Sequence, residues 1–191
     1  MMKKLDEAVG KIMQSLDEAG LSANTLVIFT NDNGGERFSD HGGLSKMKGS
    51  LWEGGIRVPA FLRWPGKIKP GSTTTQLAIT MDWTVTILSA ANFKPHPTLA
   101  MDGIDIMPHL VNNTTRNKRR LYWRTTQREK QQAMIDKKWK YLKDEKGEYL
   151  FDISEDPGEK MNLRSSQPKK FERLKKLYRR WELTLLEPVP L

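Results

Sequence analysis

The chain has 191 residues, of which 37% are hydrophobic and 29% charged, with a formal net charge of +9 and no cysteine. This length and apolar content suffice for one hydrophobic core, or one core and a small second unit, and argue against an intrinsically disordered chain. The absence of cysteine excludes disulfides and thiol chemistry, and no apolar run is long enough to span a bilayer.

A helix is predicted for residues 4–20, at the start of the chain. Its apolar residues recur at the spacing of one helical face. Gly20 suits the left-handed backbone conformation that commonly ends a helix. The apolar face consists of Leu5, Val9, Ile12, Met13 and Leu16.

Residues 25–30 are β-branched or apolar without polar alternation, which predicts a strand buried on both faces of a mostly parallel sheet. Asp32 and Asn33 follow at the carboxyl end of that strand, where open α/β sheets bind their ligands. Carboxylate and amide oxygens suit Ca²⁺ or Mg²⁺, and the next residues, Gly34 and Gly35, let the backbone turn. An ordinary turn is the alternative interpretation, because Asn, Asp and Gly are common turn residues.

Further strands are predicted for residues 57–64 and 75–80, separated by turns at Pro65-Gly66 and Pro70-Gly71. Asp82 is predicted to cap a helix over residues 83–91, since Asp is a favoured N-cap residue. Residues 92–97 contain two prolines and are expected to stop that helix.

A polar and basic stretch, residues 112–120, is the best candidate for a linker, and it divides the chain into predicted domains 1–111 and 112–191. Beyond it, short strands are predicted for residues 121–126, 132–135, 139–142 and 148–151, forming an antiparallel sheet. Trp123, Trp139 and Tyr141 on these strands suit either a core or a surface that stacks on a sugar or aryl ring.

The last predicted element is an amphipathic helix within residues 168–181, with Pro168 in its first turn and Ser166 or Gln167 near its cap. Much of the positive charge lies here and in residues 116–120. A solvated helix face explains it better than a binding patch, and no nucleic-acid motif accompanies it. We therefore predict neither nucleic acid nor a membrane as a partner.

Several motifs, in this order and spacing, resemble the sulfatase family, and together they cover nearly the whole chain. The first are Phe29-Thr30-Asn31-Asp32-Asn33-Gly34-Gly35, Ser39-Asp40-His41-Gly42-Gly43-Leu44 and Lys48-Gly49-Ser50-Leu51-Trp52-Glu53-Gly54-Gly55-Ile56-Arg57-Val58-Pro59. Others are Arg63-Trp64-Pro65-Gly66, Met101-Asp102-Gly103-Ile104-Asp105, Leu150-Phe151-Asp152-Ile153 and Asp156-Pro157-Gly158-Glu159.

The resemblance implies an α/β fold, namely the carboxyl-terminal part of an alkaline-phosphatase-like sulfatase. That part would contain a mixed sheet with flanking helices, a small antiparallel sheet and a terminal helix. The implied activity is hydrolysis of sulfuric esters, either glycan or aryl sulfates.

The resemblance also implies roles for individual residues. Asp32 and Asn33 match the family's Ca²⁺ ligands, with Mg²⁺ the less suitable ion, and Lys48 matches its sulfate-contacting lysine. An ammonium group there can contact a sulfate oxygen and offset charge on the leaving oxygen, whereas the alternative is a solvated lysine. His41 lies between these residues and is either a substrate contact or an exposed loop residue.

The sequence departs from the family in lacking the Cys/Ser-x-Pro-x-Arg motif, whose Cys or Ser becomes the formylglycine nucleophile. Ser166-Gln167-Pro168-Lys169-Lys170 ends in lysine and is better interpreted as a helix start. We therefore expect formylglycine in a missing amino-terminal half, which becomes a partner of this chain. The isolated chain is expected to be inactive and poorly soluble.

Two alternatives stay open from the sequence. One is a non-catalytic remnant or anion-binding module that keeps the fold. The other is a relative that hydrolyses phosphonates or phosphodiesters, because Asp-Asn-Gly loops also occur in that superfamily. For the parent enzyme, the resemblance implies a periplasmic, secreted or lysosomal location.

Overall fold

The computed structural model describes residues 2–93, 98, 100–112, 119–126 and 130–186. The chain forms two compact units, one of Met1–Thr30 with Ala60–Asn117 and the other of Asn31–Pro59 with Lys118–Leu191. These units do not coincide with the predicted domains 1–111 and 112–191, which stay a prediction for the complete fold. No helix among the described ranges combines the length and apolar character needed to cross a membrane.

The first unit begins with helix α1, Met2–Glu18, close to the predicted bounds, and Gly20 after it has a φ of 68°. None of the residues of α1 is buried, and Ile12 on its apolar face is 59% exposed. The 3₁₀ helix η1, Ser22–Asn24, follows. The guanidinium of Arg63 donates a hydrogen bond to Asp17 at 3.0 Å, which ties the end of α1 to strand β2, Ala60–Arg63.

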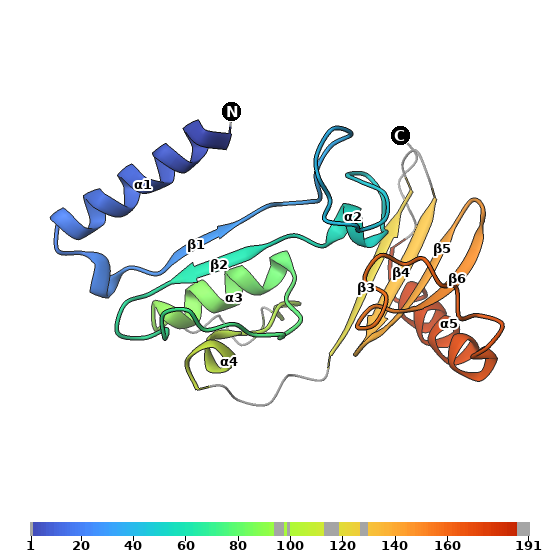
Figure 1. Ribbon diagram of the computed structural model, residues 1–191. Helices are drawn as coiled ribbons and strands as arrows, with labels where there is room; N and C mark the ends of the chain where they lie inside the picture. Colours follow the sequence, from blue (N-terminus) through green and yellow to red (C-terminus); the bar gives the residue numbers. More distant parts are fainter. Residues whose placement is uncertain (1, 94–97, 99, 113–118, 127–129, 187–191) are drawn as a thin grey trace. The chain divides into compact units, whose positions relative to one another are not determined.

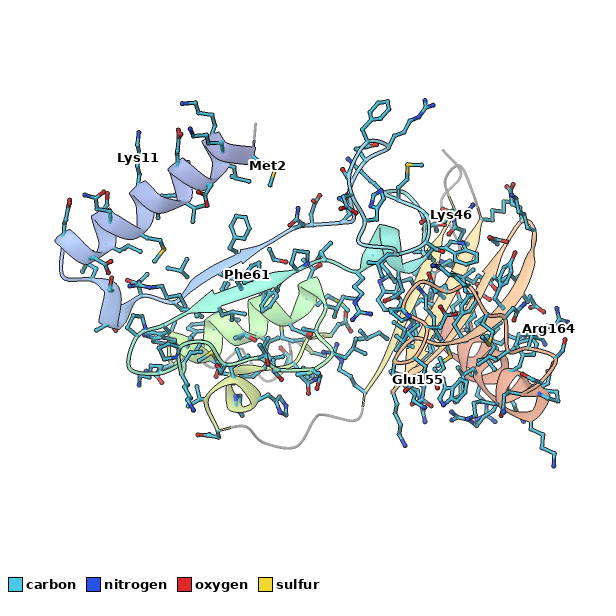
Figure 2. All side chains as sticks on the ribbon, viewed as in Figure 1. Met2, Lys11, Lys46, Phe61, Glu155 and Arg164 are labelled. Carbon is cyan, nitrogen blue, oxygen red and sulfur yellow. The ribbon has the colours of Figure 1, made fainter. Side chains whose placement is uncertain are left out.

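Strand β1, Val27–Thr30, confirms the predicted strand but not its surroundings. It pairs with β2 in an antiparallel register that sets Ile28 opposite Leu62, so the expectation of a parallel, fully buried strand is wrong here. Within the described ranges β2 is the one strand beside β1, and no residue of either strand is fully buried. Phe61, labelled in Figure 2, is 63% exposed.

The strand predicted at 75–80 is absent, since residues 72–79 have no regular structure and helix α3, Thr80–Ala90, begins where it would end. Asp82 is not the N-cap of α3. It lies inside the first turn, where its fully buried carboxylate accepts hydrogen bonds from the backbone N–H of Ile79 at 2.8 Å and of Ile104 at 2.9 Å. The short helix α4, Met107–Val111, follows.

The second unit contains a four-stranded antiparallel sheet in the order β3-β4-β5-β6, with α5 packed beside it (Figure 1). This arrangement confirms the four strands and the terminal helix predicted from sequence. Gln167 caps α5 and Pro168 occupies its first turn, as predicted, whereas most of the predicted linker 112–120 lies outside the described residues. Strand β3 is Arg120–Thr125, β4 is Gln131–Asp136, β5 is Trp139–Asp144 and β6 is Gly147–Asp152, and helix α5 is Pro168–Glu182.

One face of this sheet carries α5. The apolar stripe of the helix meets strand residues in a cluster that excludes water, which gives the hydrophobic stabilisation expected of such a helix. Tyr141 is 1% exposed inside it, so the core interpretation of this residue holds and ring stacking on a substrate does not. The cluster contains Met134, Tyr141, Leu150, Phe171, Leu174 and Tyr178, with Trp139 packed against it.

The opposite face of the sheet packs against residues 31–59, which include the short helix α2, Glu53–Ile56. Met134 belongs to the α5 cluster and its neighbour Ala133 to the second one, as expected when successive strand side chains point to opposite faces. The second cluster contains Leu51, Trp52, Ala133, Leu142 and Phe151, with Trp123 packed at its margin.

Candidate functional site

The segment 31–59 carries Asp32, Asn33, His41 and Lys48, the residues matched to the family's metal ligands and substrate contacts. It has little regular structure, yet residues 51–55 are all buried. The backbone N–H of Leu51 donates to the side chain of Gln131 on β4 at 2.7 Å, and that of Glu53 donates to Glu159 at 2.6 Å. The segment is therefore an irregular loop fixed on the sheet by buried hydrogen bonds.

An ionic cluster lies beneath α2. Nζ of Lys140 on β5 lies 2.8 Å from Oε1 of Glu53 and 2.7 Å from Oε1 of Glu159. The three side chains are at most 4% exposed. We call Glu53, Lys140 and Glu159 the buried triad. Burial raises the pKa of Glu159, and the neighbouring Lys140 ammonium offsets only part of that rise.

Glycines at positions 34 and 54 allow the loop to close on itself. A Cβ atom at Gly34 would lie 1.8 Å from the carbonyl oxygen of Gly54, and one at Gly54 would lie 2.3 Å from that of Lys46. Both distances are far inside van der Waals contact, so only glycine fits. The backbone N–H of Gly34 donates to the carbonyl of Gly55 at 2.8 Å, which joins the Asp32-Asn33 turn to α2.

Asp32 is exposed and Asn33 half-buried, directly before buried Gly34. Among the described residues, no group of three or more His, Asp or Glu side chains is placed to hold a metal ion. The two side chains offer hard oxygen donors, which fit Ca²⁺ chemically, but they supply only part of the six to eight ligands it takes.

Lys48 lies beside the same turn. Its backbone N–H donates to the carbonyl of Gly35 at 2.9 Å, and its half-exposed ammonium lies 3.4 Å from the carboxylate of Glu36. His41 is half-buried, and its Cε1 atom lies within 3.3 Å of where a Cβ at Gly35 would stand. The structure thus brings Lys48 and His41 to the turn that follows Asp32 and Asn33.

Two cavities lie elsewhere, in the first unit, with volumes of about 540 and 360 Å³. Their linings are mostly apolar and include none of the predicted site residues. The first is lined by Asn24, Leu26, Ile28, Trp64, Ile87, Ala90 and Ala91, and the second by Met2, Leu5, Asp6, Val9, Phe29 and Phe61.

Sequence reasoning missed the buried triad and the carboxylate of Glu36 beside Lys48. Glu53 and Glu159 do stand in motifs that were recognised, Trp-Glu-Gly-Gly and Asp-Pro-Gly-Glu, so those motifs held a signal. Lys140 gave none, because a lysine between Trp139 and Tyr141 on a short strand is ordinarily a solvated residue.

Comparison with known proteins yields one consistent result. The family model described as Sulfatase matches residues 1–93. The chain is 36% identical to N-acetylgalactosamine-6-sulfatase of Mus musculus over 129 residues, covering 64% of this chain and 25% of that protein. It is 32% identical to arylsulfatase A of Bos taurus over 196 residues, covering 86% of this chain and 38% of that protein.

Comparison of the fold with solved structures agrees with the sequence matches. The crystal structure of Ps i-CgsB aligns with a TM-score of 0.84 at 27% identity, over 95% of this chain and 41% of that one. The chain thus spans 25% to 41% of the lengths of these relatives. Its motifs, its matches and its alkaline-phosphatase-like fold show that the chain belongs to the sulfatase family, of whose fold it holds a carboxyl-terminal portion.

Proposed function

We propose that this chain supplies the calcium-binding and sulfate-contacting half of a sulfuric ester hydrolase. The observation that carries the proposal is the backbone hydrogen bond between Lys48 and Gly35, which holds the lysine beside the Asp32-Asn33 turn. Family membership supports the reaction class, because its named members are sulfatases.

In this proposal Asp32 and Asn33 bind Ca²⁺ through their side-chain oxygens, with further ligands from outside the segment. The bound ion would supply positive charge to the sulfate oxygens. The ammonium of Lys48 contacts the sulfate and offsets the negative charge that develops on the leaving oxygen. Substrate competes with Glu36 for Lys48, because the carboxylate of Glu36 lies 3.4 Å from the ammonium.

The nucleophile is proposed to lie outside this sequence, because the 191 residues contain no cysteine and no Ser-x-Pro-x-Arg. The segment holding formylglycine is then the partner of this chain. Positioned charges without a nucleophile leave out the covalent step, so we propose that the chain alone does not turn over sulfate esters.

For the substrate class we propose sulfated glycans or aryl sulfates. The names of the mouse and bovine relatives refer to one of each. A crystal structure of Ps i-CgsB is described in complex with k-i-k-neocarrahexaose, an observation that belongs to that protein and supports the glycan alternative here.

A binding experiment tests the role of Lys48. Isothermal titration calorimetry of the purified chain with sulfate, in the presence of Ca²⁺, should show saturable binding that Lys48→Met weakens by about tenfold or more. Lys46→Met is the matched control, because this exposed lysine lies in the same loop and should change the affinity by less than about twofold.

A turnover experiment tests the proposed reaction and the proposed location of the nucleophile outside this sequence. The chain should release no sulfate from an aryl sulfate by itself. Joined to an upstream segment that holds Cys/Ser-x-Pro-x-Arg with formylglycine formed, it should do so. Sulfate binding that Lys48→Met leaves unchanged would favour the anion-binding remnant, and faster turnover of phosphate diesters than of sulfate esters would favour the phosphodiesterase-like alternative.

A further inference from the structure

We propose that the buried triad of Glu53, Lys140 and Glu159 is a positioning device that sets the geometry of the loop bearing Asp32, Asn33 and Lys48. This inference rests on the proposed function for what the loop does. The arrangement itself stands on contacts within the second unit alone.

The triad joins three separate stretches of the chain. Glu53 opens helix α2, Lys140 lies in the middle of the sheet on β5, and Glu159 follows β6. Both ammonium–carboxylate distances are below 3 Å, and the second oxygen of Glu159 accepts the backbone N–H of Glu53 at 2.6 Å. Glu159 therefore binds both the side chain of the sheet lysine and the backbone of the loop.

A role in stability alone does not account for such a cluster. Removing three charged groups from water costs free energy that their mutual attraction only partly restores, and well-packed apolar residues often do as well or better. Glu159 also has a left-handed backbone, with a φ of 53°, which is uncommon outside glycine. The hydrogen bonds from Lys140 to Glu53 and from the backbone N–H of Glu53 to Glu159 are directional contacts, which suit a role in holding geometry.

A short series of backbone contacts connects the triad to the predicted site. Gly54 and Gly55 follow Glu53 directly. The N–H of Gly54 donates to Ser45 at 2.8 Å, and the carbonyl of Gly55 accepts the N–H of Gly34 at 2.8 Å. Gly34 follows Asn33, and Gly35 accepts the N–H of Lys48 at 2.9 Å. A displacement of Glu53 would therefore shift both the Asp32-Asn33 turn and Lys48.

The charges within the triad are not balanced, since one ammonium faces two carboxylates. The guanidinium of Arg57 lies 3.6 Å from Oε2 of Glu53 and supplies a second, half-exposed positive group. Glu159 has Lys140 as its one cationic partner among the contacts described. After loss of Lys140, Glu53 therefore keeps Arg57 as a cationic partner, whereas Glu159 has none among the contacts described. The contact between Glu159 and the loop should weaken as a result.

Amide hydrogen exchange of the whole chain, resolved by residue, tests the positioning role. In Lys140→Met the amides of Gly34, Lys48 and Gly54 should exchange at least about tenfold faster, relative to the amides of Leu174 and Tyr178 in α5. The α5 amides report opening of the whole unit, so the ratio isolates the loop.

Lys175→Met is the matched control. Lys175 on α5 lies 2.7 Å from Glu148 on the sheet, also in a largely buried pair, and the contacts described for it do not include the loop. Its loss should speed loop and α5 amides by the same factor. If the exchange rates of loop amides and α5 amides rise by the same factor in Lys140→Met, the positioning role is overturned.

Glu159→Gln serves where Lys140→Met does not fold, because it keeps the shape and the Glu53–Lys140 pair. It should show the same loop-selective effect at smaller size, and equal loop and α5 factors would again overturn the proposal.

Sulfate affinity separates this inference from the proposed function. If wild type binds sulfate and Lys140→Met weakens binding together with loop-selective exchange, both stand. If wild type binds no sulfate, the proposed function fails while the exchange ratio still decides the role of the triad. If wild type binds sulfate but Lys140→Met leaves the ratio of loop to α5 exchange unchanged, the positioning role of the triad is refuted and the proposed function stands.

Discussion

Nζ of Lys140 and Oε1 of Glu159 lie 2.7 Å apart, and neither side chain is exposed to solvent. Contacts of this kind are sensitive to the removal of one partner, because the remaining charge is left buried without compensation. The pair also makes the stability of the second unit depend on pH in a direction that can be worked out.

Burial raises the pKa of Glu159 above the ordinary value of 4.5. A carboxyl group whose pKa is higher in the folded state contributes stability that is full below the unfolded pKa and is lost as pH rises through the folded pKa. We expect Glu159→Gln to remove this loss. Urea unfolding of both proteins from pH 4.5 upward should show wild type losing stability relative to the variant; a constant difference would contradict this.

Glu148 should behave in the opposite way. Burial acts to raise its pKa, but hydrogen bonds from Lys175 and Tyr141 outweigh this effect and the net pKa is lowered. A lowered pKa gives stability that is present above the unfolded pKa and is lost as pH falls through the folded pKa. Acid unfolding followed by circular dichroism should therefore begin at higher pH in Glu148→Gln, and an unchanged midpoint would argue against the effect.

Gly34→Ala should destabilise the second unit by about 1–3 kcal/mol, because the added methyl group meets the carbonyl of Gly54 and the backbone must move. Gly10→Ala is the control, since nothing lies within 4 Å of its added Cβ and alanine favours the helix by roughly 0.5–1 kcal/mol. Denaturant unfolding measures both, and equal effects from the two substitutions would show that the loop is not tightly closed.

Leu174→Ala should cost about 2–5 kcal/mol, as for other leucines fully buried in a core. Leu174 is 0% exposed between α5 and the sheet, whereas Leu183 just beyond the helix is 86% exposed. Leu183→Ala should change stability by less than about 0.5 kcal/mol. Thermal unfolding would reveal the contrast, and a similar cost for the two leucines would mean that α5 does not pack as described.

Phe61→Thr should raise the solubility of the chain. Phe61 projects from the β1–β2 pair beside exposed Phe29, their ring centroids 6.4 Å apart, and uncovered apolar strand faces promote association. Phe38 is 95% exposed but lies on a loop, so Phe38→Thr should have a smaller effect. Light scattering at rising concentration compares the variants, and no gain from Phe61→Thr would count against this surface.

Much of the second unit was predictable because its signals are local. Short strand-like runs, with a turn at Glu145-Lys146-Gly147 between the last two, gave the four strands, and Pro168 with the apolar stripe gave α5 to within a few residues. The loop motif led to Asp32, Asn33 and Lys48 as candidates through family resemblance. Their roles as metal ligands and sulfate contact stay predictions.

The errors share a physical cause, since each depended on neighbours that the local sequence does not specify. The apolar run at 25–30 cannot distinguish a parallel from an antiparallel partner, because both require the same side chains. Thr75 and Thr80 have high strand propensity, but no strand of the described ranges pairs with them, and Asp82 stabilises a helix start instead. Lys140 was not singled out from the sequence, because its partners Glu53 and Glu159 lie near it only in the folded chain.

The loop at 31–59 lies between β1 and β2 in the chain but folds onto strands that come much later. Glu53 precedes its partner Lys140 by 87 residues and Glu159 by 106. At ribosomal speeds of about 5–20 residues per second, roughly 4–17 seconds pass between the synthesis of Glu53 and that of Lys140. During that interval Trp52 and the glycine turn emerge without the surface that will bury them, so the nascent chain exposes the loop that bears Asp32, Asn33 and Lys48 to proteases and chaperones before that loop can close.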